Sequence, residues 1–227
     1  GWRSEMRMHP GQVDVAPGAL ATALAGQFPA WAGLPVTPLA SAGTMVAPYR
    51  LGDRLVVRVP LRPEPDAAAR LRVEGERAAA LASRLPIEVA QLVGIGEPFA
   101  GHAGAWSIWT WVDGISLDRA PAVDATALAR DLALTLRAFH AEPTDGADWS
   151  RNGRGARPLA DTAWVRESLG RSAHLLDARA ATRVWERALA APPHPGRPVV
   201  IHGDPVPGNL VIRAGRLAGL IDIAPRA

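Results

Sequence analysis

Three polar side chains near the end of the sequence have the types and spacing of a phosphate-handling site. His202-Gly203-Asp204 is separated from Asn209 by four residues, and Asp222 follows after a further apolar stretch. Carboxylate and amide oxygens suit Mg²⁺, which takes few protein ligands and keeps substrate phosphates and waters as the others. A third oxygen group, on Asp204, is a carboxylate that could accept a proton. His202, just before this loop, is expected to orient the loop by hydrogen bonds and not to act as a base. The set therefore predicts chemistry on a phosphate chain.

A β-hairpin must position these side chains. The sequence after Asp204 predicts a hairpin with its turn at residues 214–215. Counting back from that turn places Asn209 opposite Leu220, with Asp222 diagonal to Asn209 on the same face. The alternative is a capped loop and a buried hairpin, in which Asp204 and Asn209 only satisfy loop backbone.

The rest of the chain falls into two parts that differ in predicted secondary structure. Residues 36–114 are strand-like with one helix at 67–85, and residues 115–200 are mainly helical. A hairpin is expected around Gly52-Asp53, and further strands at residues 89–93 and 106–112. Helices are expected to begin at Asp124, Asp161 and Asp177, because an Asp at the N-cap accepts a hydrogen bond from the first turn.

Composition excludes several classes of protein. The 227 residues contain no cysteine, which excludes a disulfide scaffold, a thiolate nucleophile and a Cys-ligated metal. The net charge is only +3, and the pI of 10.7 is high because every basic residue is Arg and almost nothing titrates between neutrality and the loss of the Arg protons. This gives little support to a nucleic-acid partner. No membrane segment or signal peptide is predicted, since residues 16–25 read as a short amphipathic helix, and a cytoplasmic location is expected.

The layout of Asp204, Asn209 and Asp222 matches that of protein kinases, in which an Asp-x4-Asn loop precedes a second metal-binding Asp. With Gly203 before the first Asp and Ile221 before the second, the variant resembles the aminoglycoside phosphotransferase family. The resemblance implies a kinase-like two-lobed α+β fold and transfer of the γ-phosphate of ATP to a hydroxyl group. Asp204 would accept or orient the hydroxyl proton, and Asn209 and Asp222 would hold Mg²⁺.

The resemblance covers residues 36–223 and implies a domain organisation. Residues 1–108 would form the β-rich N-lobe on the nucleotide phosphate side, 109–114 the hinge, and 115–227 the helical C-lobe with the catalytic loop and metal-binding hairpin. Family members continue past their Ile-Asp motif with helices that help to bind the acceptor. By that comparison, the C-terminal part of the C-lobe is expected to be absent from this chain.

The resemblance also assigns a phosphate-binding cation. Family members have a strand Lys that holds the α and β phosphates and pairs with a helix Glu. Arg58 stands at that place, and a guanidinium can still clamp phosphates. Glu76 is the expected partner of Arg58, with Glu74 as the alternative. A surface Arg beside a solvated Glu is the simpler interpretation.

Two further segments resemble nucleotide contacts of the family. Ser41, Gly43 and Thr44 lie where a glycine-rich loop covers the phosphates, although a plain hairpin would explain them equally well. Trp111 and Val112 lie where hinge backbone groups bind adenine, although a Trp that ends a strand commonly serves packing.

The reaction that the resemblance implies needs ATP, Mg²⁺ and a small-molecule hydroxyl acceptor. An aminoglycoside-like antibiotic is the expected acceptor, which would make the protein an antibiotic-resistance kinase. A macrolide, homoserine or choline kinase is the alternative within the same chemistry. A nucleotide-binding pseudokinase is the alternative outside it, because the phosphate loop and Arg58 depart from the family pattern. A nucleic acid or a membrane is not expected as a partner.

Overall fold

The structure is a computed structural model that describes residues 12–40, 45–64, 66–144, 162–192 and 196–223. Contacts divide the chain into two units: Gly1–Thr135 with Pro205–Ala224, and Leu136–Asp204 with Pro225–Ala227. This division does not coincide with the lobes expected from the sequence, because the C-terminal hairpin and the start of the long helix group with the N-terminal residues. The two-lobe boundary at residues 109–114 therefore stays a prediction.

The first unit contains a five-stranded antiparallel sheet in the order β1-β2-β3-β6-β5. Its strands are β1 (Val36–Pro38), β2 (Val46–Leu51), β3 (Leu55–Pro60), β5 (Leu92–Gly96) and β6 (Trp106–Thr110). The predicted hairpin around Gly52-Asp53 is present, and Gly52 has a φ of +54°, a conformation that glycine adopts without steric cost. The tight turn sets the β2–β3 register, which places Arg58 opposite Pro48.

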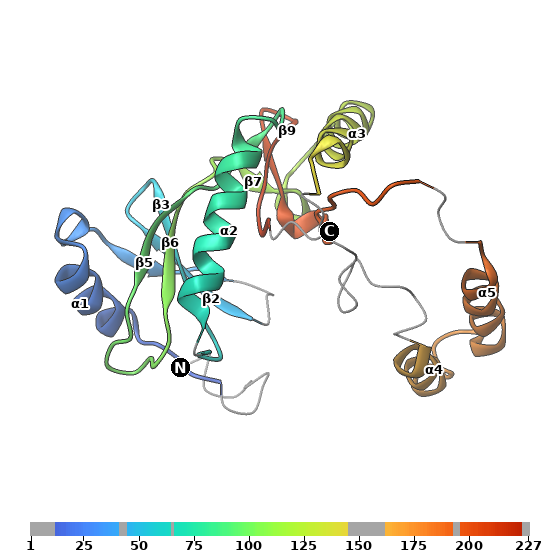
Figure 1. The fold of residues 1–227 in the computed structure, drawn as a ribbon, viewed down its shortest axis with the longest axis horizontal. Coiled ribbons are helices and arrows are strands. Elements are labelled where there is room, and N and C mark those ends of the chain that lie inside the picture. Colours follow the sequence, from blue (N-terminus) through green and yellow to red (C-terminus); the bar gives the residue numbers. More distant parts are fainter. Residues whose placement is uncertain (1–11, 41–44, 65, 145–161, 193–195, 224–227) are drawn as a thin grey trace. The chain divides into compact units, whose positions relative to one another are not determined.

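The two faces of this sheet have different roles. Helix α1 (Pro17–Gln27) covers one face, where Leu20 and Leu24 join a buried apolar cluster. The strand residues of that cluster are Tyr49, Leu51, Val57, Val59, Trp106 and Ile108. Because side chains alternate along a strand, Arg58 belongs to the opposite face. Helix α2 (Ala67–Ala82) runs along the sheet and packs on β5 (Figure 1).

A second sheet joins the C-terminal hairpin to the first unit, in the order β4-β9-β8-β7. Its strands are β4 (Glu88–Val89), β7 (Ile115–Ser116), β8 (Leu210–Arg213) and β9 (Arg216–Leu220), with β4 parallel to β9. The strand expected at 89–93 is thus two short strands in different sheets. The break lies at Gln91, whose amide nitrogen donates to the Thr110 hydroxyl (2.8 Å). This switch places the start of the predicted strand beside β9.

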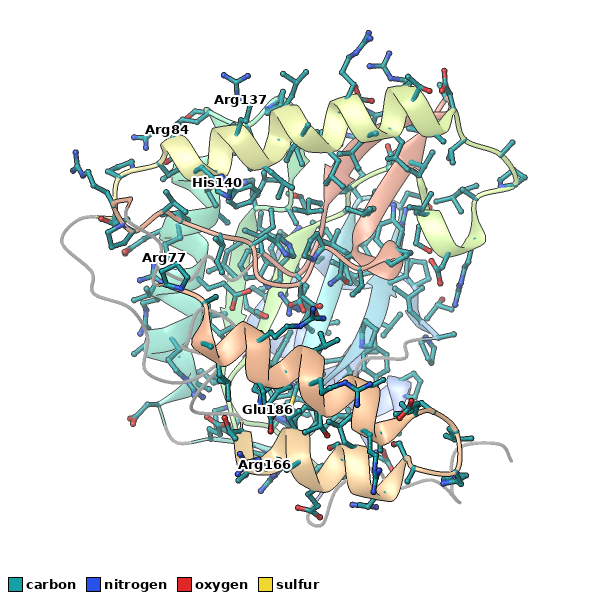
Figure 2. The ribbon with its side chains drawn as sticks, turned by 90° about the vertical axis from the view of Figure 1, so that its right-hand side faces the viewer. Arg77, Arg84, Arg137, His140, Arg166 and Glu186 are labelled. Atoms are coloured by element: carbon teal, nitrogen blue, oxygen red, sulfur yellow. The ribbon has the colours of Figure 1, made fainter. Side chains whose placement is uncertain are left out.

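The helices of the second half begin largely where the sequence indicates. Asp124 caps α3 (Ala125–Ala141) by accepting hydrogen bonds from the amides of Thr126 and Ala127, and Asp177 caps α5 (Ala178–Ala190). Asp161 lies outside the described residues, and α4 (Thr162–Arg171) follows it. In the second unit, α4 and α5 lie side by side, with Arg166 on α4 and Glu186 on α5 (Figure 2).

Asp131 of α3 ties this helix to the hairpin. Its carboxylate accepts hydrogen bonds from Nε (2.7 Å) and a terminal nitrogen of Arg216, and from the Leu217 amide (3.4 Å). Hydrogen bonding by Arg216 holds the pKa of Asp131 below its ordinary value of 3.8. A depressed carboxyl pKa stabilises the folded state above the ordinary value, and this stabilisation is lost as the pH falls through the lowered one.

We therefore expect Asp131→Asn to lower the melting temperature at pH 7. The difference from the wild type should fade in acid, where the wild-type carboxyl also becomes neutral. Thermal denaturation from pH 7 down to about pH 2, so that the range passes through the lowered pKa of Asp131, measures this, with the exposed Asp118→Asn as the control. An equal deficit at every pH would show that the ion pair does not stabilise the hairpin.

Candidate active site

The hairpin that carries the predicted metal ligands differs in register from the expectation. Arg213 pairs with Arg216 as predicted, but Leu210 pairs with Leu220 because Ala218 is an extra residue in β9. This bulge shifts the pairing by one position, so the Ile221 amide donates to the Asn209 carbonyl (3.0 Å). The predicted pairing of Asn209 with Leu220, and the diagonal placement of Asp222 that depended on it, are wrong.

Asp222 reaches the site by an unusual backbone conformation. β9 ends at Leu220, and Asp222 has a φ of +59°, in the left-handed region that non-glycine residues seldom occupy. Such conformations persist only where the surrounding structure holds them in place, and they are concentrated at functional sites. Here the Asp222 carboxylate is held by the Arg58 guanidinium, at 2.8 Å between Oδ1 and a terminal nitrogen.

Arg58 lies between two carboxylates. One terminal nitrogen donates to Oε1 of Glu74 at 3.0 Å, and the other donates to Asp222. The helix partner of Arg58 is therefore Glu74, the alternative named from the sequence, and the expected Glu76 is exposed on another side of α2. The physical reason is the helical period. Glu74 is four residues before the buried Ala78, so its side chain points toward the sheet.

Burial and charge set the ionisation of this cluster. Desolvation raises the pKa of Glu74 above its ordinary value of 4.5; the Arg58 guanidinium lowers it, and the nearby Asp222 carboxylate raises it again. The side chains of Arg58 and Glu74 are each 23% exposed, whereas that of Asp222 is 53% exposed. One guanidinium thus pairs with two carboxylates and leaves the cluster with a net negative charge, and of the two carboxylates only that of Asp222 is widely exposed to solvent.

Asn209 ends the 3₁₀ turn Pro207–Asn209 that leads into β8, and it is partly buried. Its amide oxygen and the Asp222 carboxylate are the donor types that Mg²⁺ accepts. The described residues contain no group of three His, Cys, Asp or Glu side chains able to hold a metal ion. A cation here would therefore depend on phosphate and water oxygens for most of its ligands, as Mg²⁺ does beside nucleotides.

The loop that carries Asp204 belongs to the second unit. His202 is 4% exposed and packs edge-on against Phe139 of α3, at 6.0 Å between ring centroids. Its Nδ1 accepts a hydrogen bond from the Asp204 amide (3.1 Å), and Gly203 between them has a φ of +85°. The prediction that His202 orients this loop by hydrogen bonding is confirmed. The buried ring and the left-handed glycine together fix the backbone from which the Asp204 side chain extends.

The predicted hinge contains an interaction that the sequence did not indicate. The guanidinium carbon of Arg50 lies 3.6 Å from the centre of the Trp111 ring, a cation–π contact. The Trp111 amide donates to the Arg54 carbonyl (2.7 Å), so it is already satisfied within the protein. The Val112 backbone makes no hydrogen bond in the part of the chain that the structure describes.

Ser41, Gly43 and Thr44, the predicted phosphate loop, lie outside the described residues. Two interactions among the described residues were not predicted from the sequence. They are the hydrogen bonds of Asp131 to the hairpin and the ion pair between Arg58 and Asp222. Arg58 and Asp222 are 164 positions apart, so no local pattern could reveal their contact. The sequence did contain a pattern that favours Glu74 over Glu76 as the partner of Arg58. Glu74 is the one acidic residue on the stripe of α2 that runs through Ala67, Leu71, Ala78 and Leu81.

The sequence and the fold of the chain are similar to those of known proteins. The sequence pattern of the phosphotransferase enzyme family matches residues 39–223, which include the Arg58 strand, the Asp204 loop and the hairpin. The chain belongs to this family. None of the curated proteins matches the chain in sequence. The resemblance to aminoglycoside phosphotransferases is thus confirmed at the level of the enzyme family, and the protein is a phosphotransferase.

Solved structures support the same fold. The GDP complex of wild-type aminoglycoside 2'-phosphotransferase-IIIa has a TM-score of 0.67 at 21% identity, over 92% of this chain and 73% of that one. The streptomycin–ATP complex of APH(2")-IIa has a TM-score of 0.59 at 18% identity, over 94% and 72%. Macrolide 2'-phosphotransferase MphH from Brachybacterium faecium has a TM-score of 0.59 at 25% identity, over 90% and 70%. The predicted kinase-like α+β fold is confirmed.

None of the helices in the described segments combines the length and apolar character that a membrane span requires.

Proposed function

We propose that this phosphotransferase moves the γ-phosphate of ATP to a hydroxyl group of a small molecule, with an aminoglycoside-like antibiotic as the acceptor class. The observation that carries the proposal is the cluster of Arg58, Glu74 and Asp222. It joins a strand cation to a helix carboxylate and to a carboxylate of the metal-binding type. Structural neighbours with bound GDP, or with ATP and streptomycin, support the nucleotide and acceptor classes. A cytoplasmic location, where ATP is available, belongs to the same proposal.

Each site residue has a role that follows from its chemistry. Asp204, on the loop ordered by His202, accepts the proton of the acceptor hydroxyl and orients its oxygen. Asn209 and Asp222 would hold Mg²⁺, which neutralises phosphate charge when bound. Arg58 donates to a phosphate oxygen through the terminal nitrogen that does not hold Glu74. Phosphoryl transfer depends mainly on such positioning and electrostatics.

The remaining nucleotide contacts are proposed from the family resemblance. Backbone amides around Ser41, Gly43 and Thr44 would cradle the phosphates. Val112 would supply a backbone group to the base, with Trp111 packed beside it under Arg50. In this proposal Glu74 replaces Glu76 as the carboxylate that holds Arg58 in place.

A macrolide is the second candidate acceptor. The macrolide phosphotransferase MphH has the highest identity to this chain among the structures reported above, at 25%. Because both acceptor classes present hydroxyl groups, the proposed chemistry at Asp204 is the same for either. A panel that contains both classes separates them by which compounds accept phosphate.

Binding of Mg·ATP tests the nucleotide part of the proposal. A ligand that binds only the folded state at about 100 times its dissociation constant stabilises it by about 2.7 kcal/mol. We therefore expect a clear rise in melting temperature with Mg·ATP, a similar or smaller rise with Mg·GTP, and little with Mg²⁺ alone. No rise with either nucleotide would remove the basis for an ATP-dependent function.

A further inference from the structure

Arg58 makes an ion pair on each side of its guanidinium. Its two terminal nitrogens donate to Glu74 (3.0 Å) and to Asp222 (2.8 Å), and its guanidinium lies 5.8 Å from the centre of the Trp109 ring. A guanidinium can hold two carboxylates at once because its donors form a rigid planar fork, whereas an ammonium is a point charge. Because position 58 on β3 is Arg, its side chain pairs with Asp222, the carboxylate that we assign to the metal, as well as with Glu74.

We propose that the Arg58 guanidinium is the counter-ion of Asp222 before nucleotide binds, and that it keeps divalent cations off this carboxylate until nucleotide phosphates compete for the guanidinium. The proposal rests on the function proposed above, because it uses the same residues. It adds a role for Arg58 in setting the order in which metal and nucleotide bind.

The local charges favour this arrangement. Without Arg58, the carboxylates of Glu74 and Asp222 would face each other across a partly desolvated site. Asp222 is near enough to raise the pKa of Glu74. A single positive charge between them offsets part of that repulsion, and a divalent cation at Asp222 would lie close to the guanidinium and be repelled by it.

The exposure of the three side chains indicates which of the two ion pairs of Arg58 is replaced when phosphate binds. Arg58 and Glu74 are 23% exposed, so their pair is sheltered, while Asp222 at 53% can be approached from solvent. The Arg58–Asp222 contact is accordingly the weaker of the two against competition by water and ions. Phosphate oxygens offer the Arg58 terminal nitrogen a new acceptor. The carboxylate released in this way becomes available to a metal that arrives with the nucleotide.

Mn²⁺ binding without nucleotide tests the proposal on the whole protein, read as loss of the electron paramagnetic resonance signal of free Mn²⁺. The wild type should bind Mn²⁺ weakly, and Arg58→Gln should bind it at least about tenfold more tightly, since the opposing charge is removed. Arg58→Lys should fall between them, because one ammonium cannot hold both carboxylates in the paired geometry. Melting curves check that each variant folds, and Arg58→Lys carries the test if Arg58→Gln does not.

Two further variants show whether the gain arises at Asp222. Arg70→Gln removes an exposed arginine that pairs with Glu64, and it should leave Mn²⁺ binding unchanged. Asp222→Asn placed in the Arg58→Gln background should abolish the gain. Equal Mn²⁺ affinity in the wild type and both Arg58 variants would overturn the proposal, as would a gain that survives Asp222→Asn. These measurements contain no nucleotide, so their outcome is independent of whether Mg·ATP stabilises the protein.

Discussion

Asp204→Asn should reduce the rate of phosphoryl transfer by about 10²- to 10⁴-fold, the usual contribution of a positioned base. The change keeps the size of the side chain and replaces its charged carboxylate with a neutral amide, which cannot accept the hydroxyl proton. The loop itself should persist, because its order comes from the Asp204 amide and the buried His202 ring, neither of which is altered. Mg·ATP affinity and the melting temperature should therefore stay near the wild-type values. Steady-state kinetics on an accepted substrate, with calorimetric nucleotide binding, measures both quantities.

Asp177→Asn is the matched control for this variant. Asp177 lies in the same unit, at the N-cap of α5, where Asn caps about as well as Asp. It should leave rate, affinity and stability unchanged. If Asp204→Asn keeps most of its activity, or if it loses activity only as far as it loses stability, Asp204 is not the proton acceptor.

Asp222→Asn should fail in a different way, by lowering nucleotide affinity together with rate. Asn cannot supply the negative charge that attracts Mg²⁺, and even residues outside the first metal shell typically contribute about 10- to 100-fold to metal affinity. We expect the affinity for Mg·ATP to fall at least about tenfold and the Mg²⁺ concentration for half-maximal activity to rise. Titration of Mg²⁺ at fixed ATP, together with direct nucleotide binding, measures the two effects.

Asp66→Asn is the corresponding control in the first unit. Asp66 precedes α2 and makes no side-chain cap hydrogen bond, so its change should affect neither quantity. Selective loss of Mg·ATP affinity in Asp222→Asn, at an unchanged melting temperature, is the pattern that the account requires. A lower melting temperature with unchanged nucleotide affinity would instead make Asp222 a structural residue that holds Arg58.

The sequence predicted those parts of the site that depend on neighbours along the chain. The turn at residues 214–215, the caps at Asp124 and Asp177, and the loop-ordering role of His202 each depend on contacts within a few positions or on one side-chain type. The choice between Glu74 and Glu76 was also available from the sequence, because only Glu74 shares the apolar stripe of α2. The family resemblance identified the Glu-Gly-Glu segment at residues 74–76. The expectation of Glu76 within that segment did not take the helical period into account.

The register of the hairpin could not be predicted in the same way. The bulge at Ala218 lies next to Leu217, whose amide donates to Asp131 of α3, and nothing near residue 218 indicates that contact. The strand break at Gln91 likewise depends on Thr110 in another strand. Both features arise from partners far along the chain, and both affect the position of the C-terminal hairpin in the first unit.

Mass spectrometry of candidate acceptors incubated with the protein, ATP and Mg²⁺ shows whether the protein phosphorylates a small molecule. The panel should contain aminoglycosides and macrolides, with Asp204→Asn protein and a reaction without Mg²⁺ as parallel samples. We expect at least one compound to gain the mass of one phosphoryl group, and this gain to be lost in both parallel samples. ADP formation with no phosphorylated compound, or a product formed equally well by Asp204→Asn, would contradict it.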